Sequence, residues 1–178
     1  MKSKLMPSIV LSAICLVVAL LLSAINLVTA PVIEEQQRKK AEAALAEVLP
    51  DGENFETVTI MDENGQLLAG LPTTLKEAKS CDKGYVFQLV VTGYKPGLTI
   101  MVGVGSDGKI TGAKHIASNE TYGLEPELNG AYVGKDADSI SKIIASGATA
   151  NSLTSQAYYT AMTDALAAFA ALTSDGGN

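Results

Sequence analysis

The chain has 178 residues, a net charge of -6, and two cysteines, Cys15 and Cys81. Apart from one long apolar segment near its start, this length suits a single domain with a core of its own. The acidic balance provides no basic patch for phosphates, so we expect no nucleic-acid partner. The two cysteines are far apart and form no C-x-x-C motif, which excludes a zinc or iron–sulfur site built from cysteines of this chain and predicts no metal site.

The apolar segment runs from Leu5 to Ile33 without a charged residue. A helix needs roughly 20 apolar residues to cross a bilayer, so residues 1–33 are predicted to form a single-pass transmembrane anchor in the cell (inner) membrane. Lys2 and Lys4 precede the segment, which predicts a cytoplasmic N-terminus and an extracytoplasmic C-terminal domain. The alternative is a cleaved signal peptide, but its apolar region is about 7–15 residues long, shorter than this segment.

Strong helix formers dominate the stretch from Glu34 to Leu45. This stretch contains few apolar residues, which is typical of a solvated helix. We therefore predict a connecting helix over residues 34–50, which ends near Pro50-Asp51-Gly52.

Residues 51–173 are predicted to form the folded domain, with residues 174–178 as a flexible tail. Alternating apolar and β-branched residues, separated by turn sequences, predict strands joined by hairpins and paired antiparallel. The expected strands cover residues 56–60, 66–69, 84–91, 98–104 and 110–116. From Ala150 the apolar spacing becomes helical. The predicted fold class is α+β, an antiparallel sheet with covering helices, tethered by one transmembrane helix.

Ser146-Gly147-Ala148-Thr149 stands immediately before the predicted last helix. Small residues leave a loop backbone accessible, and a helix start offers free N–H groups and a positive dipole end, which together suit a phosphate. A threonine hydroxyl at this position can hold the phosphate covalently if a dedicated transferase activates the reaction. The alternative is ordinary helix capping by Thr149 or Asn151.

This motif resembles that of the FMN-binding domain family, which includes the G subunits of Rnf ion-translocating oxidoreductases and the C subunits of sodium-pumping quinone reductases. In the family, FMN is bonded through its phosphate to the last threonine of the motif, a phosphoprotein-type linkage. The resemblance therefore implies covalent FMN on Thr149, within a loop formed with Ser146, Gly147 and Ala148. It also implies a flavin transferase as the partner in maturation.

Three further segments carry the same resemblance. The stretch Glu120-Thr121-Tyr122-Gly123-Leu124 is similar to a family loop that packs by the flavin ring, which implies flavin contacts from Glu120, Thr121, Gly123 and Leu124. Thr92-Gly93-Tyr94 is similar to the family's entry into the central strands. The anchor followed by a charged helix ending in residues 45–50 also matches, so the resemblance covers nearly the whole chain.

The resemblance implies an electron-transfer flavoprotein subunit of an ion-translocating ferredoxin:NAD+ oxidoreductase, not a stand-alone enzyme and without catalytic residues of its own. Its expected partners are the other integral and peripheral subunits of the complex and the lipid bilayer. The alternative is a membrane-tethered accessory or sensory module of the same fold without flavin. Ile143 and Tyr122 favour that alternative, since the family often has Asp and Pro there.

Three side chains outside these motifs are candidates for redox roles. His115, the single histidine, is either a proton donor near the flavin or structural, and the second is the favoured interpretation. Tyr158 and Tyr159 on the last helix are expected in the core and on the surface rather than as electron relays.

Overall fold

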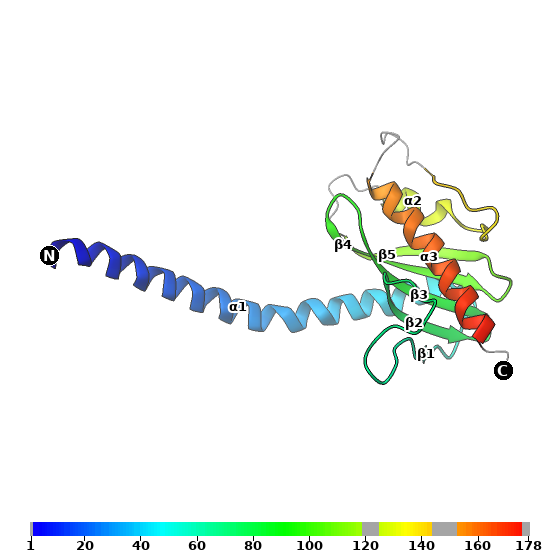
Figure 1. The fold of residues 1–178 in the computed structure, drawn as a ribbon, viewed down its shortest axis with the longest axis horizontal. Coiled ribbons are helices and arrows are strands. Elements are labelled where there is room, and N and C mark those ends of the chain that lie inside the picture. The colour runs from blue at the N-terminus through cyan, green and yellow to red at the C-terminus, as the bar shows by residue number, and fades with distance from the viewer. Residues whose placement is uncertain (1, 119–124, 144–152, 176–178) are drawn as a thin grey trace. The chain divides into compact units, whose positions relative to one another are not determined.

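The computed structural model describes residues 2–118, 125–143 and 153–175. The chain divides into two compact units, residues 1–39 and residues 40–178. One helix, α1 (Lys2–Val48), contributes to both of them, so the predicted anchor and the predicted connecting helix belong to one continuous element (Figure 1).

The first unit contains only residues of α1, up to Lys39. Its described large apolar side chains between Val10 and Leu27 are all exposed. Within the parts of the chain that the structure describes, no helix combines enough length and apolar character to cross a membrane. The helix continues through Pro31, although proline lacks the N–H that would bond to the preceding turn.

The second unit is built on a five-stranded antiparallel sheet in the order β1-β2-β3-β4-β5. The strands are β1 (Glu56–Val58), β2 (Leu75–Cys81), β3 (Gly84–Thr92), β4 (Pro96–Gly105) and β5 (Ile110–Ala117). Every strand pairs antiparallel with its neighbour in sequence. At the β4–β5 turn, Gly108 has a φ of 78°, a conformation that glycine adopts without steric cost. The predicted antiparallel α+β architecture is confirmed.

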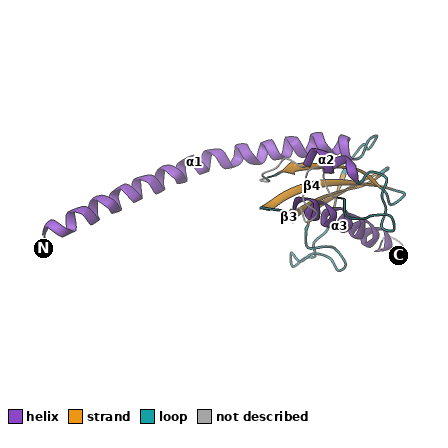
Figure 2. Ribbon diagram, turned by 90° about the horizontal axis from the view of Figure 1, so that it is seen from above, coloured by secondary structure: helices purple, strands orange, loops and turns teal. Residues whose placement is uncertain are grey.

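Both faces of the sheet are covered. On one face Phe87 and Leu89 are fully buried in a core with α3 (Leu153–Asp175) and with α2 (Glu125–Ala131). On the other face Val86 and Met101 pack against the last residues of α1. Figure 2 shows α3 on one side of the strands and the end of α1 on the other. Since successive residues of a strand point to opposite faces, β3 supplies both cores.

Two glycines allow the end of α1 to lie directly on the sheet. Gly103 and Gly112 are partners in the β4–β5 register, and a Cβ atom on either would collide with the backbone of Val48. Thr111 Oγ1 donates a hydrogen bond to Val48 O at 2.5 Å, and Lys114 Nζ forms an ion pair with Glu47 Oε1 at 2.8 Å. The hydroxyl therefore satisfies a carbonyl that the helix leaves without an internal partner.

The expectation of a strand over residues 66–69 is wrong. The structure has only an isolated bridge between Met61 and Leu67, because the side chain of Asp62 organises a tight turn. Its Oδ1 accepts hydrogen bonds from the backbone N–H groups of Asn64 and Gln66, at 2.9 and 2.8 Å. Such local side-chain bonds compete with sheet pairing. The strand β2 and the short helix α2 are not predicted by the sequence pattern.

Candidate functional site

The predicted flavin-binding residues fall in two segments that lie outside the described residues. These residues are Ser146, Gly147, Ala148, Thr149, Glu120, Thr121, Gly123 and Leu124. One segment lies between β5 and α2, and the other lies between Ile143 and the start of α3. The described elements that adjoin the candidate site are therefore β5, α2 and α3.

The start of α3 suits a phosphate. This helix has 23 residues, and its first turn contains no acidic side chain that would oppose the positive end of the helix dipole. Leu153, the first described residue of α3, is exposed. Thr149 lies four residues before Leu153 in the sequence, outside the described residues.

The side chain of Asn129, on α2, joins α2 to both β5 and α3. Its Oδ1 accepts a hydrogen bond from the backbone N–H of His115 at 3.2 Å and another from Tyr158 Oη at 2.8 Å. Its Nδ2 lies 3.3 Å from His115 Nδ1. Figure 1 shows α2 beside the first turns of α3, in agreement with these contacts. One amide thus connects the three elements that adjoin the two candidate segments.

The chemistry of the partners fixes the orientation of this amide. A backbone N–H can only donate, so the oxygen of Asn129 must face His115 N and the NH2 group must face His115 Nδ1. Nδ1 then accepts the hydrogen bond, which places the ring proton of a neutral His115 on Nε2. His115 is partly buried and built into this network, which supports the structural interpretation of its role.

Tyr132, directly after α2, holds the chain just before the candidate motif. Its side chain is fully buried, and its hydroxyl accepts a hydrogen bond from the backbone N–H of Ile143 at 3.1 Å. Burial raises the pKa of the Tyr132 phenol above its usual value of 10.0, and the bond from Ile143 partly opposes that rise. The hydroxyl therefore stays protonated at neutral pH.

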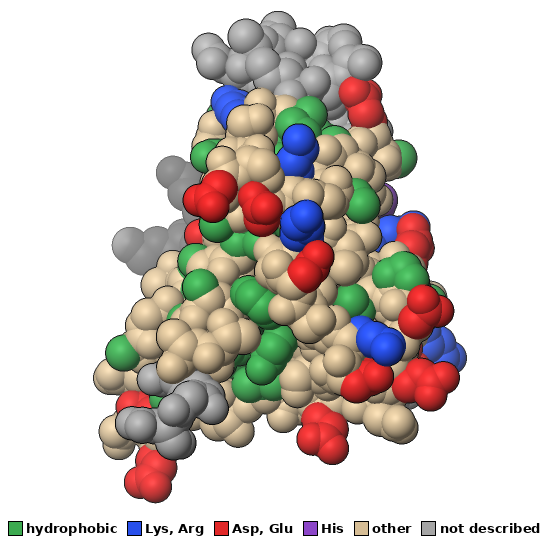
Figure 3. Space-filling view, turned by 90° about the vertical axis from the view of Figure 1, so that its right-hand side faces the viewer, with side chains coloured by type: hydrophobic (Ala, Val, Ile, Leu, Met, Phe, Trp, Pro, Cys, Tyr) green, Lys and Arg blue, Asp and Glu red, His purple; other side chains and the backbone are tan. Residues whose placement is uncertain are grey.

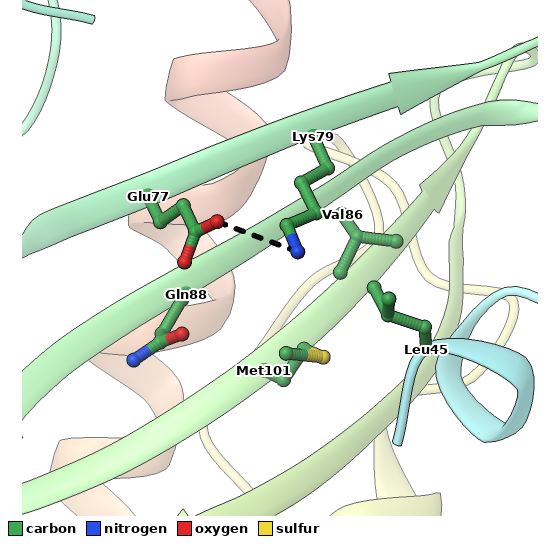
Figure 4. A pocket seen from close by; sticks show the side chains of 6 residues that line it. All are labelled: Leu45, Glu77, Lys79, Val86, Gln88 and Met101. Atoms are coloured by element: carbon green, nitrogen blue, oxygen red, sulfur yellow. Dashed lines mark ion pairs between the residues drawn. The ribbon is translucent and has the colours of Figure 1, made fainter. Parts of the chain in front are cut away.

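A hollow on the face of the sheet that packs against α1 is too small to be a flavin site. It is lined by Leu45, Glu77, Lys79, Val86, Gln88 and Met101 (Figure 4). Its volume of about 10 Å³ is about the space of one water molecule, far below that of a flavin ring. Glu77 and Lys79, both on β2, form an ion pair at 3.4 Å in its lining. It faces the end of α1 and lies away from α2 and α3.

The charged side chains of the face drawn in Figure 3 are mixed in sign. Acidic and basic groups alternate there with apolar and neutral side chains. This face therefore presents charges of both signs to the solvent.

The bridging side chains are recognisable from the sequence only in part. Tyr158 is fully buried, as expected for the core, and it also bonds to Asn129. Sequence patterns identify neither Asn129 nor Tyr132 as a site residue. No local pattern could reveal Asn129, because its partners lie 14 and 29 residues away along the chain.

The chain is similar in sequence to known proteins in two regions. Residues 2–48 match the profile of the RnfG N-terminal region, and residues 93–167 match the FMN-binding domain. A similar protein is the G subunit of the Na(+)-translocating ferredoxin:NAD(+) oxidoreductase complex of Acetobacterium woodii, 34% identical over 133 residues. That match covers 70% of this chain and 64% of the relative, so the chain spans less than two thirds of the relative's length. The second profile includes β4, β5, α2 and both candidate segments, and with the first it shows that the chain belongs to the RnfG family of FMN-binding-domain proteins.

Proposed function

We propose that the chain is an electron-transfer flavoprotein subunit of a membrane-bound, ion-translocating ferredoxin:NAD+ oxidoreductase complex, with FMN bonded through its phosphate to Thr149. The observation that carries the proposal is the start of α3, whose first turn has no acidic side chain and which follows Ser146-Gly147-Ala148-Thr149. The match of residues 93–167 to the FMN-binding domain supports the same cofactor.

The phosphoester requires an activated flavin donor. Thr149 Oγ1 would form the new bond to the flavin-side phosphorus of flavin adenine dinucleotide. The anhydride bond would break, adenylate would leave, and the hydroxyl proton would pass to this leaving group. A free threonine hydroxyl is a poor nucleophile, so a flavin transferase is needed. When bound, FMN supplies one- and two-electron redox chemistry. The chain's residues bind it, orient it and prevent its loss outside the cytoplasm.

The membrane location is part of the proposal. The uncharged run from Leu5 to Ile33 and the exposed apolar side chains of residues 10–27 in α1 support an anchor with a cytoplasmic N-terminus. A single helix encloses no ion pathway, so ion movement requires integral partner subunits. The name of the Acetobacterium woodii relative, which is one subunit of a complex, supports such partners.

The test is the intact mass of the protein produced together with a flavin transferase. A mass increase of one FMN phosphoester, with fluorescence of the denatured band in a gel, is expected for the native chain. Thr149→Ala should lose both signals, whereas the matched control Thr160→Ala should keep them, because the Thr160 hydroxyl bonds within α3 to Gln156 O. Fluorescence that persists in Thr149→Ala would exclude this attachment site. A native chain without flavin would favour the flavin-free tethered module.

A further inference from the structure

We propose that Asn129 is a positioning residue for the flavin, because it sets α2 against β5 and α3 and so fixes the points from which the two flavin-binding segments start. The inference rests on the proposed function and adds a residue outside the predicted site. Asn129 touches neither segment among the described contacts, so it acts through the elements that carry them.

The first support is the position of α2 in the chain. This helix has only seven residues, and it begins directly after the segment with Glu120 and Thr121. A helix this short is not stable by itself, so tertiary contacts must hold it in place. Packing provides part of the hold, since Leu128 is fully buried.

The second support is the set of partners that one amide reaches. Through His115 it holds β5, which leads into the first segment, and through Tyr158 it holds α3, which follows the second segment. An apolar side chain of similar size would fill the space but would leave the His115 N–H without this acceptor. Loss of such partly buried bonds loosens the elements they join.

The third support is an independent connection beside the same short helix. The Tyr132 hydroxyl holds Ile143 N, three residues before Ser146. Side chains on α2 or directly after it therefore bond to the described chain on both sides of the second segment. Tyr132 bonds to Ile143 before the segment, and Asn129 bonds to Tyr158 after it. A displacement of α2 would therefore shift the described residues that border both segments.

The experiment uses the full-length, flavin-loaded protein and compares Asn129→Leu, Asn129→Asp and Tyr158→Phe. Two flavin properties are measured, the midpoint potential and the quenching of flavin fluorescence by iodide. In Asn129→Leu we expect the quenching constant to rise about fivefold, the change in a local opening equilibrium when one such bond is lost. Asn129→Asp retains an oxygen for His115 N and Tyr158 Oη, so it should lie between the native protein and the Leu variant. Tyr158→Phe should give a smaller change in the same direction.

The matched control is Thr74→Val. It removes a side-chain bond from Thr74 Oγ1 to Asp164 Oδ2 at 2.6 Å, which also ties α3 to the rest of the domain but involves no part of α2. It should leave both flavin properties at native values even if it lowers stability. If Asn129→Leu does not fold, Tyr158→Phe decides, since it keeps the ring in the core.

Native-like quenching and potential in the flavin-loaded Asn129 or Tyr158 variants overturn the positioning role. Equal changes in Thr74→Val also overturn it, because they would reflect general destabilisation. These outcomes leave the proposed function intact, because flavin is still present. Absence of covalent FMN from the native protein, seen by intact mass, overturns the proposed function and this inference with it.

Discussion

The hydroxyl of Thr111, on β5, donates a hydrogen bond to the backbone carbonyl of Val48, the last residue of α1. The bond joins residues 63 positions apart, at a helix end where carbonyls have no partner within the helix. It fixes where α1 stops on the sheet.

Replacing Thr111 with valine should lower the free energy of unfolding by about 1 kcal/mol, the usual value of one intramolecular hydrogen bond, and more if Val48 O is left unsatisfied. Urea unfolding of the two proteins measures the difference. Thr173→Val is the control, because the exposed Thr173 hydroxyl bonds only within α3, and its change should stay within about 0.5 kcal/mol. Equal stability of Thr111→Val and the native chain would show that the bond contributes nothing.

A methyl group at Gly112 should destabilise the domain by about 1–3 kcal/mol, the range for overpacking. Its Cβ would lie 2.9 Å from Val48 Cα, and backbone cannot move aside as a flexible side chain can. Thermal unfolding of Gly112→Ala tests this. The control Gly130→Ala, in α2, meets nothing within 4 Å and should be neutral or stabilising, since alanine favours helix. A Gly112→Ala melting temperature at or above the native one would contradict the close approach of α1.

Removal of residues 1–39 should leave a folded domain, whereas removal of residues 1–49 should not. The first truncation keeps Ala44, Val48 and Leu49, which close the second core; the second deletes them. Each large apolar side chain buried there contributes about 1.5–3 kcal/mol. Circular dichroism and amide hydrogen exchange of both truncations provide the test. A cooperative, native-like melt of the shorter protein would mean that this face of the sheet needs no cover from α1.

Stability should fall at alkaline pH through Tyr132. Burial raises the pKa of its phenol above 10.0 in the folded state, so the folded protein retains a proton that the unfolded chain releases. The stability contributed by the neutral form is therefore full below pH 10.0 and is lost as pH rises through the folded-state pKa. Urea unfolding from pH 8 to about 11.5 should show a steeper decline in the native chain than in Tyr132→Phe. Parallel curves for the two proteins would assign the decline to other groups.

The proposed topology predicts that protease added to intact spheroplasts cuts the domain that follows α1. The reason is the pair Lys2 and Lys4 before the apolar segment, since short basic flanks stay in the cytoplasm. Immunoblotting of the digested cells against the domain gives the answer, with a cytoplasmic protein as the control for lysis. Protection until the cells are lysed would place the domain on the inner side.

The sequence predicts those parts of the fold in which local pattern and tertiary role coincide. The strands β3 and β4 are predictable because β-branched and apolar residues dominate them, and β5 because the turn Ser106-Asp107-Gly108-Lys109 leads into it from β4. In β2 a register shift between Leu75 and Glu77 breaks the period of two, and three of its residues are charged, Lys76, Glu77 and Lys79, so the run does not resemble a strand. The helix α2 is too short for a period to be visible.

The candidate site likewise has one part that the sequence predicts and one part that it does not. The small-residue motif ending at Thr149 is a local sequence feature that is visible without a structure, although its residues lie outside the described parts. The Asn129 bridge depends on three elements meeting in space, and neither His115 nor Tyr158 is a neighbour of Asn129 in the sequence. Tertiary structure alone identifies it.

The pairing of every strand with its sequence neighbour has a consequence for synthesis. Each hairpin can form as soon as its second strand has left the ribosome, since its contacts are local. The face with Phe87 and Leu89, however, stays open until the 23 residues of α3 have been made, because that helix comes last. The nascent domain therefore exposes an apolar sheet for most of its translation, and a ribosome stalled before Leu153 would leave a chain prone to aggregation.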